Sequence, residues 1–292
     1  MGQRGTRGIV PDTVVCMGRV ITLTTDFGLV DGYVGAVKGV ILSINRNATL
    51  VDVSHEVSPQ DVFDAAFVLG TSYPYFPPDT IHLAVVDPGV GSERSALALS
   101  TPHGIFVGPD NGVLTWPVLD NLGEAKKPSR LGRLKLPEGA AVKAVRLTES
   151  KFWMRGPSRT FHGRDIFGPV AAYLSLGTPL DSLGPEIKDL SVLSVPTPRW
   201  VSPSRVEGEV LRIDRFGNLV TNMKASDVEK LGSGVMFAVA GREIAGLSAY
   251  YGEKPGLLAL VGSSGYVEIA LQNGSAAKAL EVGRGTKVTA TA

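Results

Sequence analysis

"RVITLTTDFGLVDGYVGAVKGVILSIN", residues 19–45, is the stretch that decides the fold of the first half of this chain. Residues 19–26 are rich in β-branched side chains and predict a strand, whereas residues 31–45 carry apolar side chains at helical spacing and predict a helix. The order then repeats, with strands expected at 48–55, 80–87, 95–100 and 104–109 and helices at 58–73 and 163–177. This alternation predicts an α/β domain with a mostly parallel sheet flanked by helices.

Details of the two early helices follow from their residue types. The second helix is expected to have Ser58 as its N-cap and Pro59 at its first helical position. The first contains Gly32, Gly35 and Gly39, which we attribute mainly to close packing of the helix on the sheet, with ligand contact as the alternative.

The triplet Asp26-Phe27-Gly28 is not the magnesium motif of a kinase, because only 25 residues precede it and the other kinase motifs cannot be present. A Walker phosphate loop is also missing, since the glycine and lysine spacing is wrong. Asp26 and Asp87 each stand where a predicted strand runs out. Ligands lie beyond the carboxyl ends of strands in such sheets, so both carboxylates are expected to face one site. Asp31 could serve the same ligand, although each aspartate alone could be an N-cap.

The pattern changes in the second half of the chain. Residues 194–205 are proline-rich and aperiodic, which predicts a linker. Short strands with glycine turns follow, which predicts a smaller all-β, barrel-like domain. The expected division is an extension at 1–18, an α/β catalytic domain at 19–193, a linker at 194–205 and an all-β substrate-binding domain at 206–292.

Composition points to a small-molecule partner. With 292 residues and a net charge of +1, the chain has no excess charge to attract nucleic acid or an anionic membrane. The basic segment 120–158 is therefore interpreted as a solvated surface excursion, with a possible strand at 140–149, and not as a nucleic-acid patch. Cys16 is the single cysteine, which excludes an internal disulfide and fits a cytoplasmic protein. Neither a signal peptide nor a membrane span is expected, and no histidine pair has the spacing of a zinc site.

Seven motifs that follow one another along most of the chain carry a family resemblance: "TTDFGLVDGYVGAVKG", "VDVSHEVSPQDVFDAA", "AVVDPGVGSERSALAL", "VGPDNGVL", "TFHGRDIFGPVAA", "IDRFGNLVTN" and "SSGYVEIA". Together they resemble the S-adenosyl-L-methionine hydroxide adenosyltransferase family, whose relatives include the nucleophilic fluorinase and chlorinase. The resemblance implies an α/β domain, a β-barrel-like domain and a homotrimer, with the site between the first domain of one subunit and the second domain of its neighbour. The implied reaction hydrolyses S-adenosyl-L-methionine to adenosine and L-methionine, with no metal or redox cofactor.

By the same resemblance, the family's catalytic residues match Asp87, Arg94 and His162, Asp26 matches the aspartate that binds the ribose hydroxyls, and Asp31 matches one that meets the methionine amino group. Candidate substrate-binding residues of the second domain are Asp214, Phe216, Asn218, Ser263, Tyr266 and Glu268. Phe216 is implied to stack on adenine and Ser263 to lie at the amino-acid end. The roles of Tyr266 and Glu268 are less defined.

These residues form a coherent site for activating water. Arg94 could stabilise developing hydroxide, His162 could accept a proton, and Asp87 could orient the water or its partners. Without the resemblance, His162 would be interpreted as a structural or exposed histidine, as His55, His82 and His103 are here.

Two positions favour water over halide as the nucleophile. His162-Gly163 stands where the fluorinase has a Tyr-Ser pair, and Asp87 where both halogenases have a tyrosine. A further difference is Gln60, which replaces a tryptophan that packs over the sugar. Two other functions remain as alternatives: a halide-dependent 5′-halo-5′-deoxyadenosine synthase, and a non-catalytic module that binds S-adenosylmethionine or adenosine.

Overall fold

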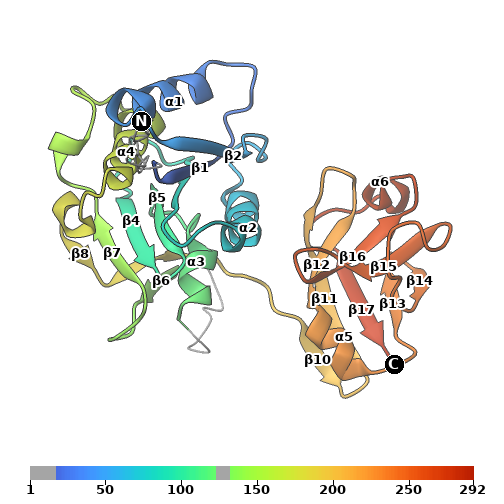
Figure 1. The fold of residues 1–292 in the computed structure, drawn as a ribbon. Coiled ribbons are helices and arrows are strands. Elements are labelled where there is room, and N and C mark those ends of the chain that lie inside the picture. Colours follow the sequence, from blue (N-terminus) through green and yellow to red (C-terminus); the bar gives the residue numbers. More distant parts are fainter. Residues whose placement is uncertain (1–17, 123–131) are drawn as a thin grey trace, which may run out of the picture. The chain divides into compact units, whose positions relative to one another are not determined.

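The computed structural model describes residues 18–122 and 132–292, which form two compact units (Figure 1). The first unit holds the described residues up to 122 together with Arg133–Val192, and the second holds Leu193–Ala292. All of the predicted extension except Gly18 lies outside the described residues, and so does Cys16. No helix in the described part of the chain is long and apolar enough to cross a membrane.

A seven-stranded sheet in the order β2-β1-β3-β5-β4-β7-β8 forms the centre of the first unit. Its strands are β1 Val20–Thr25, β2 Thr49–Ser54, β3 Ile81–Val85, β4 Ala96–Thr101, β5 Gly104–Pro109, β7 Lys143–Arg146 and β8 Glu186–Ile187. The β2–β1, β1–β3 and β3–β5 pairs are parallel, whereas β5–β4, β4–β7 and β7–β8 are antiparallel. The α/β class is confirmed, but the sheet is mixed and only partly parallel.

The short connection between β4 and β5 explains the mixed sheet. β4 ends at Thr101 and β5 begins at Gly104. Only an antiparallel hairpin can be closed by so few residues, because a parallel pair needs a crossover of about a dozen or more. β7 then joins the antiparallel side with Ala144 and Val145 buried. β7 thus confirms the strand that the sequence suggested at 140–149, within the basic segment 120–158.

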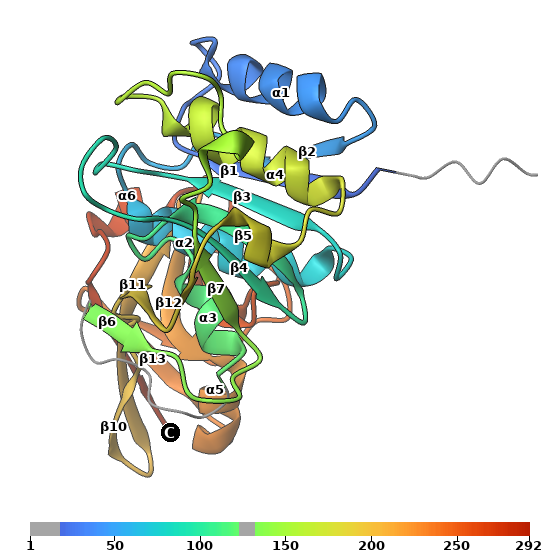
Figure 2. The same ribbon diagram turned by 90° about the vertical axis from the view of Figure 1, so that its left-hand side faces the viewer.

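Helices cover both faces of this sheet (Figure 2). They are α1 Tyr33–Ile44, α2 Val62–Ser72, α3 Thr115–Asp120 and α4 Gly168–Ser175, with 3₁₀ turns at Tyr73–Tyr75, Ser150–Phe152 and Leu180–Leu183 and a π-helical turn at Gly163–Phe167. One core packs α1 and α4 against the sheet through residues such as Ile41 and Phe167, and the other packs α2 and α3 through residues such as Leu69 and Phe106.

α2 begins later than the sequence predicts. Its N-cap is Asp61, whose Oδ1 accepts the backbone N–H of Asp64 at 2.9 Å, and not Ser58. The cause is Gln60, whose φ of +65° lies in the left-handed region and cannot continue a right-handed helix. The chain therefore turns at Gln60, and the backbone N–H of this residue is free to point toward the end of β1.

The glycines of α1 do not have the role that the sequence suggested. A Cβ placed on Gly32, Gly35 or Gly39 would meet no atom within 4 Å, so close packing on the sheet is wrong for these three. The residues that α1 buries are instead Val34, Val37 and Ile41. The glycines lie away from that apolar face.

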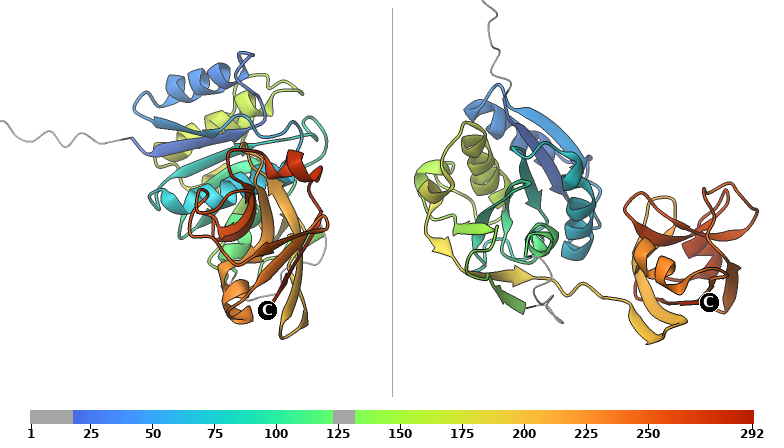
Figure 3. Two further views of the ribbon diagram at one scale, coloured as in Figure 1. Left: turned by 90° about the vertical axis from the view of Figure 1, so that its right-hand side faces the viewer. Right: turned by 60° about the horizontal axis from the view of Figure 1, so that its bottom comes forward.

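The second unit is an antiparallel sheet in the order β14-β13-β17-β11-β12-β16-β15, with β10 added beside β11 (Figure 3). Its elements are β10 Arg199–Ser202, β11 Arg205–Ile213, β12 Leu219–Lys224, α5 Ala225–Leu231, β13 Met236–Val239, β14 Arg242–Ala245, β15 Leu257–Val261, β16 Tyr266–Leu271, α6 Ala276–Leu280 and β17 Lys287–Thr291. Ser248, just beyond β14, donates its N–H to Ala259 of β15 at 2.7 Å. The two ends of the sheet thus nearly close a barrel, as predicted.

Three further short strands remain among the described residues, two in a sheet of their own and one in the predicted linker. β6 Gly132–Lys135 and β9 Asp189–Val192 form a separate two-stranded sheet. β10 falls within the segment predicted as a linker, where Trp200 pairs with Val206 of β11. Residues 199–202 are therefore strand, because a tight turn returns the chain directly onto β11.

Candidate active site

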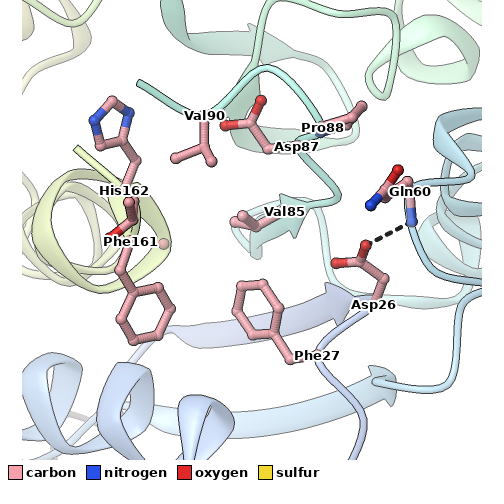
Figure 4. Close-up of a pocket in the computed structure, with 11 residues that line it drawn as sticks. Asp26, Phe27, Gln60, Val85, Asp87, Pro88, Val90, Phe161 and His162 are labelled. Atoms are coloured by element: carbon pink, nitrogen blue, oxygen red, sulfur yellow. Dashed lines mark hydrogen bonds between the residues drawn. The ribbon is translucent and has the colours of Figure 1, made fainter. Parts of the chain in front are cut away.

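A cavity of about 220 Å³ lies where β1 and β3 end (Figure 4). Asp26 directly follows β1, and Asp87 stands two residues beyond β3; both line the cavity. The two residues thus line one cavity, as their positions at the strand ends led us to expect. His162, at the start of the π-helical turn before α4, lines the same cavity.

Arg94 joins the other two predicted catalytic side chains. Its Nε donates to Asp87 Oδ1 at 3.0 Å, and its Nη2 donates to Asp87 Oδ2. The same Nη2 lies 2.7 Å from Nδ1 of His162. The Asp87 and Arg94 side chains are 5% and 11% exposed, so this bidentate ion pair is shielded from water. The structure therefore brings Asp87, Arg94 and His162 together as one bonded group.

The contact with Arg94 defines the state of the His162 ring. A guanidinium can only donate, so Nδ1 of His162 accepts, and the proton of the neutral ring is on Nε2. Burial lowers the pKa of His162, and the positive charge of Arg94 lowers it further, while Asp87 and Asp165 act in the opposite direction. His162 is consequently neutral in this arrangement near pH 7.

Three features of the chain hold this group in place. A Cβ on Gly91 would collide with the carbonyl oxygen of Arg159, and its φ of +78° also suits glycine, so the turn after β3 can approach the segment that leads to His162. On that segment, Ser158 donates its N–H to the buried Asp165 at 2.8 Å. The guanidinium of Arg94 also lies 5.3 Å from the centre of the Phe167 ring.

Asp26 is held by the backbone of Gln60. The Gln60 N–H donates to Asp26 Oδ2 at 2.8 Å, and Figure 4 shows the other carboxylate oxygen pointing into the cavity. Gln60 lines the cavity as well, at the place where the sequence noted the loss of a tryptophan. The left-handed backbone of Gln60, which the sequence did not reveal, is what directs its N–H toward Asp26.

Aromatic rings that the sequence analysis did not single out form the floor of the cavity. Phe27 packs edge-on against Phe161 with ring centres 5.7 Å apart, and Tyr33 packs on both. A Cβ on Gly163 would approach Phe27 to 3.2 Å, so a side chain at this position would crowd the Phe27 ring. The chain turns directly after Phe27, where Gly28 has a φ of +64°, and the Phe27 ring lines the cavity.

Asp31 does not join this group. It lies in the loop between β1 and α1, is exposed, and is not among the residues that line the cavity. Its neighbours Leu29 and Val30 are 68% and 99% exposed, so the loop presents an apolar surface to solvent.

In the second unit, the turn between β11 and β12 organises three of the predicted residues. Asp214 Oδ1 accepts the backbone N–H groups of Phe216 and Asn218 at 2.9 and 2.8 Å, and its Oδ2 accepts Nδ2 of Asn218 at 2.8 Å. Gly217, with a φ of +86°, leaves no room for a Cβ because Ser275 packs against it. This rigid turn exposes 78% of Phe216.

Glu268 lies close to the same turn. It is buried in β16 and accepts the hydroxyl of Tyr251 at 2.7 Å, a partner that the sequence analysis missed. Burial raises the pKa of Glu268, the bond from Tyr251 opposes this, and the charge of Asp214 raises it again. The other oxygen of the carboxylate packs against Gly262, which precedes Ser263. Tyr266 instead pairs with Lys224 across β12 and β16.

Comparisons with known proteins agree over most of the chain. A model of the SAM hydroxide adenosyltransferase N-terminal domain matches residues 21–184, and a model of the corresponding C-terminal domain matches residues 208–289. An (R)-S-adenosyl-L-methionine hydrolase from Salinispora arenicola is 39% identical over 275 residues, covering 93% of this chain and 97% of that protein. Another from Methanocaldococcus jannaschii is 35% identical over 276 residues, covering 90% and 92%.

More distant and structural relatives point the same way. A fluorinase from an Actinoplanes species is 27% identical over 241 residues, covering 74% of this chain and 75% of that protein. The crystal structure of an uncharacterized conserved protein from Thermotoga maritima is 35% identical, with a TM-score of 0.82 over 94% of this chain and all of that chain.

Proposed function

This chain belongs to the SAM hydroxide adenosyltransferase family, and on that premise we propose that it hydrolyses S-adenosyl-L-methionine to adenosine and L-methionine. The observation that carries the proposal is the bonded group of Asp87, Arg94 and His162 at one cavity, beside a carboxylate at the end of β1. A guanidinium between a carboxylate and an imidazole is a suitable site for a water molecule that must act as a nucleophile.

The reaction is an in-line displacement at the ribose 5′ carbon. The oxygen of water forms a bond to that carbon while the carbon–sulfur bond breaks. The electron pair of the carbon–sulfur bond goes to sulfur, so methionine leaves as a neutral thioether. Because a sulfonium is already a good leaving group, it needs no protonation. The enzyme has to hold water behind the carbon and remove its proton, and positioning of this kind contributes several kcal/mol.

The hydrogen bonds within the group assign separate roles to its members. Nδ1 of His162 already accepts from Arg94, so this nitrogen cannot take the proton of water while that bond persists. Asp87, whose carboxylate lines the cavity, orients the water and accepts its proton. Arg94 stabilises the hydroxide-like oxygen, and neutral His162 fixes the orientation of Arg94. This differs from the sequence hypothesis, in which His162 was the proton acceptor.

The remaining candidates bind the substrate in this proposal. Asp26, with one oxygen free, accepts the ribose hydroxyls, and Asp31 meets the methionine ammonium from the rim loop. Phe216 stacks on adenine, since a large aromatic side chain exposed on a rigid turn is typical of a binding surface. The other residues proposed to bind the substrate from the second unit are Asp214, Asn218, Ser263, Tyr266 and Glu268.

We also propose that the protein is a homotrimer in which the first unit of one copy and the second unit of another contribute to each site. The support is the family resemblance, together with the division of the candidate residues between two compact units. Sedimentation equilibrium tests the assembly. A mass of three chains agrees with it, and a monomer at micromolar concentration contradicts it.

The test of function is chromatography of the products formed from S-adenosyl-L-methionine. Wild type should release adenosine and methionine, and Asp87→Ala and His162→Ala should each be slower by roughly 10² to 10³-fold. Asp189→Ala is a matched control, because it removes a carboxylate that pairs with Arg133 at 3.0 Å outside the cavity. Equal adenosine release by all four proteins would refute the assigned site, and 5′-chloro-5′-deoxyadenosine as the main product in chloride would refute the reaction.

A further inference from the structure

A buried histidine, His55, lies next to the site and takes no part in the proposed reaction steps. His55 follows β2 and is only 4% exposed. Its Nδ1 lies 2.8 Å from the hydroxyl of Thr25, the last residue of β1. Its Nε2 lies 3.0 Å from Asp52 Oδ1, a distance of ion-pair contact without the alignment of a full hydrogen bond. From the sequence, His55 was interpreted only as a structural or exposed histidine.

His55 secures the chain on both sides of Asp26. Before Asp26, its ring contacts the hydroxyl of Thr25, and that oxygen in turn accepts the N–H of Phe27 at 3.3 Å. After Asp26, the backbone carbonyl of His55 accepts the N–H of Gly28 at 2.8 Å. A single buried residue therefore fixes both ends of the turn that carries the Asp26 carboxylate.

The donors and acceptors of this network form a consistent series when the ring is neutral. The Thr25 oxygen accepts from the backbone, so its own proton is available for Nδ1 of His55. The ring proton is then on Nε2 and faces Asp52. Asp52 also accepts from Lys38 of α1 at 2.6 Å. The series thus extends from a partly exposed ion pair to the turn at the cavity.

We infer that Thr25 and His55, supported by Asp52, position the Asp26 carboxylate for the ribose hydroxyls. This rests on the proposed function, in which Asp26 binds those hydroxyls. Thr25 and His55 are positioning residues, because Asp26 and not they would touch the substrate. The inference predicts that disturbing them weakens recognition of the ribose hydroxyls specifically.

Thr25→Val is the variant that tests this, because it removes the hydroxyl and keeps the shape. A contact made equally in the ground and transition states raises KM when it is lost and leaves kcat almost unchanged. We expect KM for S-adenosyl-L-methionine to rise roughly tenfold and kcat to stay within about threefold. Thr25→Ser, which keeps the hydroxyl, should restore the wild-type KM.

The same strand supplies a matched control. Thr22 is also buried in β1, and its hydroxyl lies 2.9 Å from Nδ1 of another buried histidine, His82. Thr22→Val therefore removes the same kind of Thr–His bond three residues earlier, away from the turn at Asp26. If Thr25 only stabilises the fold, both valine variants should lower the melting temperature, and neither should change KM.

The decisive measurement is calorimetric binding of adenosine and of 2′,3′-dideoxyadenosine to the full chain. Wild type should bind adenosine more tightly. Thr25→Val should weaken adenosine binding roughly tenfold with no change for the dideoxy compound, whereas Thr22→Val should alter neither. Equal weakening of both ligands by Thr25→Val, or none of either, would overturn the inference.

Other outcomes separate this inference from the proposed function. If wild type neither hydrolyses S-adenosyl-L-methionine nor binds adenosine, the proposed function fails and the positioning role fails with it. If Thr25→Val does not fold, Asp52→Ala serves instead, because Asp52 is partly exposed. Asp181→Ala is its control, since it breaks a surface ion pair with Lys143 at 2.5 Å. Asp52→Ala should reduce the preference for adenosine over the dideoxy compound, and Asp181→Ala should not. The same preference in both variants would contradict the inference.

Discussion

The candidate residues of the two units are organised in opposite ways. In the first unit, the Asp87 and Arg94 side chains are largely shielded from solvent, and Arg94 bonds to both Asp87 and His162. In the second unit, the carboxylate of Asp214 accepts backbone N–H groups of its own turn, and this turn exposes the Phe216 ring to solvent. An interlocked group of charges suits chemistry, and an exposed ring on a rigid turn suits recognition. Substitutions in the first unit should therefore lower mainly kcat, and substitutions in the second unit should raise mainly KM.

The largest effect is expected at Arg94. Arg94→Met keeps the length of the side chain but leaves the shielded Asp87 carboxylate without its partner and removes the charge that stabilises hydroxide. We predict that kcat/KM falls roughly 10³-fold, mostly through kcat. Arg133→Met is the control, because Arg133 also bonds two aspartates but outside the cavity. A loss confined to KM would mean that the first unit only binds substrate.

A smaller effect, of a different kind, is expected at Phe216. Phe216→Ala removes a stacking surface worth about 1–2 kcal/mol, so KM should rise roughly tenfold with kcat within about threefold. Tyr75→Ala is the control, since Tyr75 is 77% exposed but lies in the 3₁₀ turn after α2, in the first unit. A large fall in kcat for Phe216→Ala would abolish the distinction between the two units.

Mixing variants sharpens the same comparison. Asp87→Ala carries an intact second unit, and Phe216→Ala an intact first unit. If sites are shared between copies of a trimer, an equal mixture that is unfolded and refolded should regain about a quarter of the wild-type sites. No recovery above the sum of the two variants would show that each site belongs to a single chain.

Lowering the pH should have the smallest effect on activity but should clearly reduce the stability of the first unit. All four histidines lie in the first unit. Burial lowers the pKa of His82 to about 4 from 6.5, so the unfolded chain binds a proton more readily than the folded one between these values. Stability is therefore retained above pH 6.5 and lost as pH falls toward 4. The loss reaches about 3 kcal/mol at the low end.

The second unit should respond in the opposite direction at Glu268. Its raised pKa means that the folded state holds the proton better, so this residue favours folding more as pH falls toward 4.5. Pulse proteolysis in urea, with the fragments identified, measures the two units separately. His82→Leu should flatten the acid loss of the first unit without changing KM. An unchanged acid loss in this variant would refute the assignment to His82.

Much of this could be predicted from the sequence, and the failures have physical causes. Asp26 and Asp87 could be grouped because each stands at or just beyond the end of a strand, and topology brings these strand ends to one edge. The start of α2 was missed because nothing in its residue type shows that Gln60 adopts a left-handed backbone. His55 was overlooked because its partner Thr25 comes from another strand, 30 residues away.

Other differences arise from tertiary contacts that local pattern does not encode. The glycines of α1 have the spacing of a packing face, but the branched side chains between them decide which face is buried. Tyr251 comes from the segment between β14 and β15, and only the closing of the barrel brings it to Glu268. Neither distinction could be read from spacing alone.

The most direct test of the central claim is a single turnover in heavy-oxygen water, with enzyme in excess over S-adenosyl-L-methionine. If water attacks the ribose carbon, as proposed, mass spectrometry should find the label in the 5′ hydroxyl of adenosine and none in the peptide that contains Asp87. Unlabelled adenosine with label in Asp87 would instead show that the Asp87 carboxylate attacks first and forms an ester, which would contradict the account.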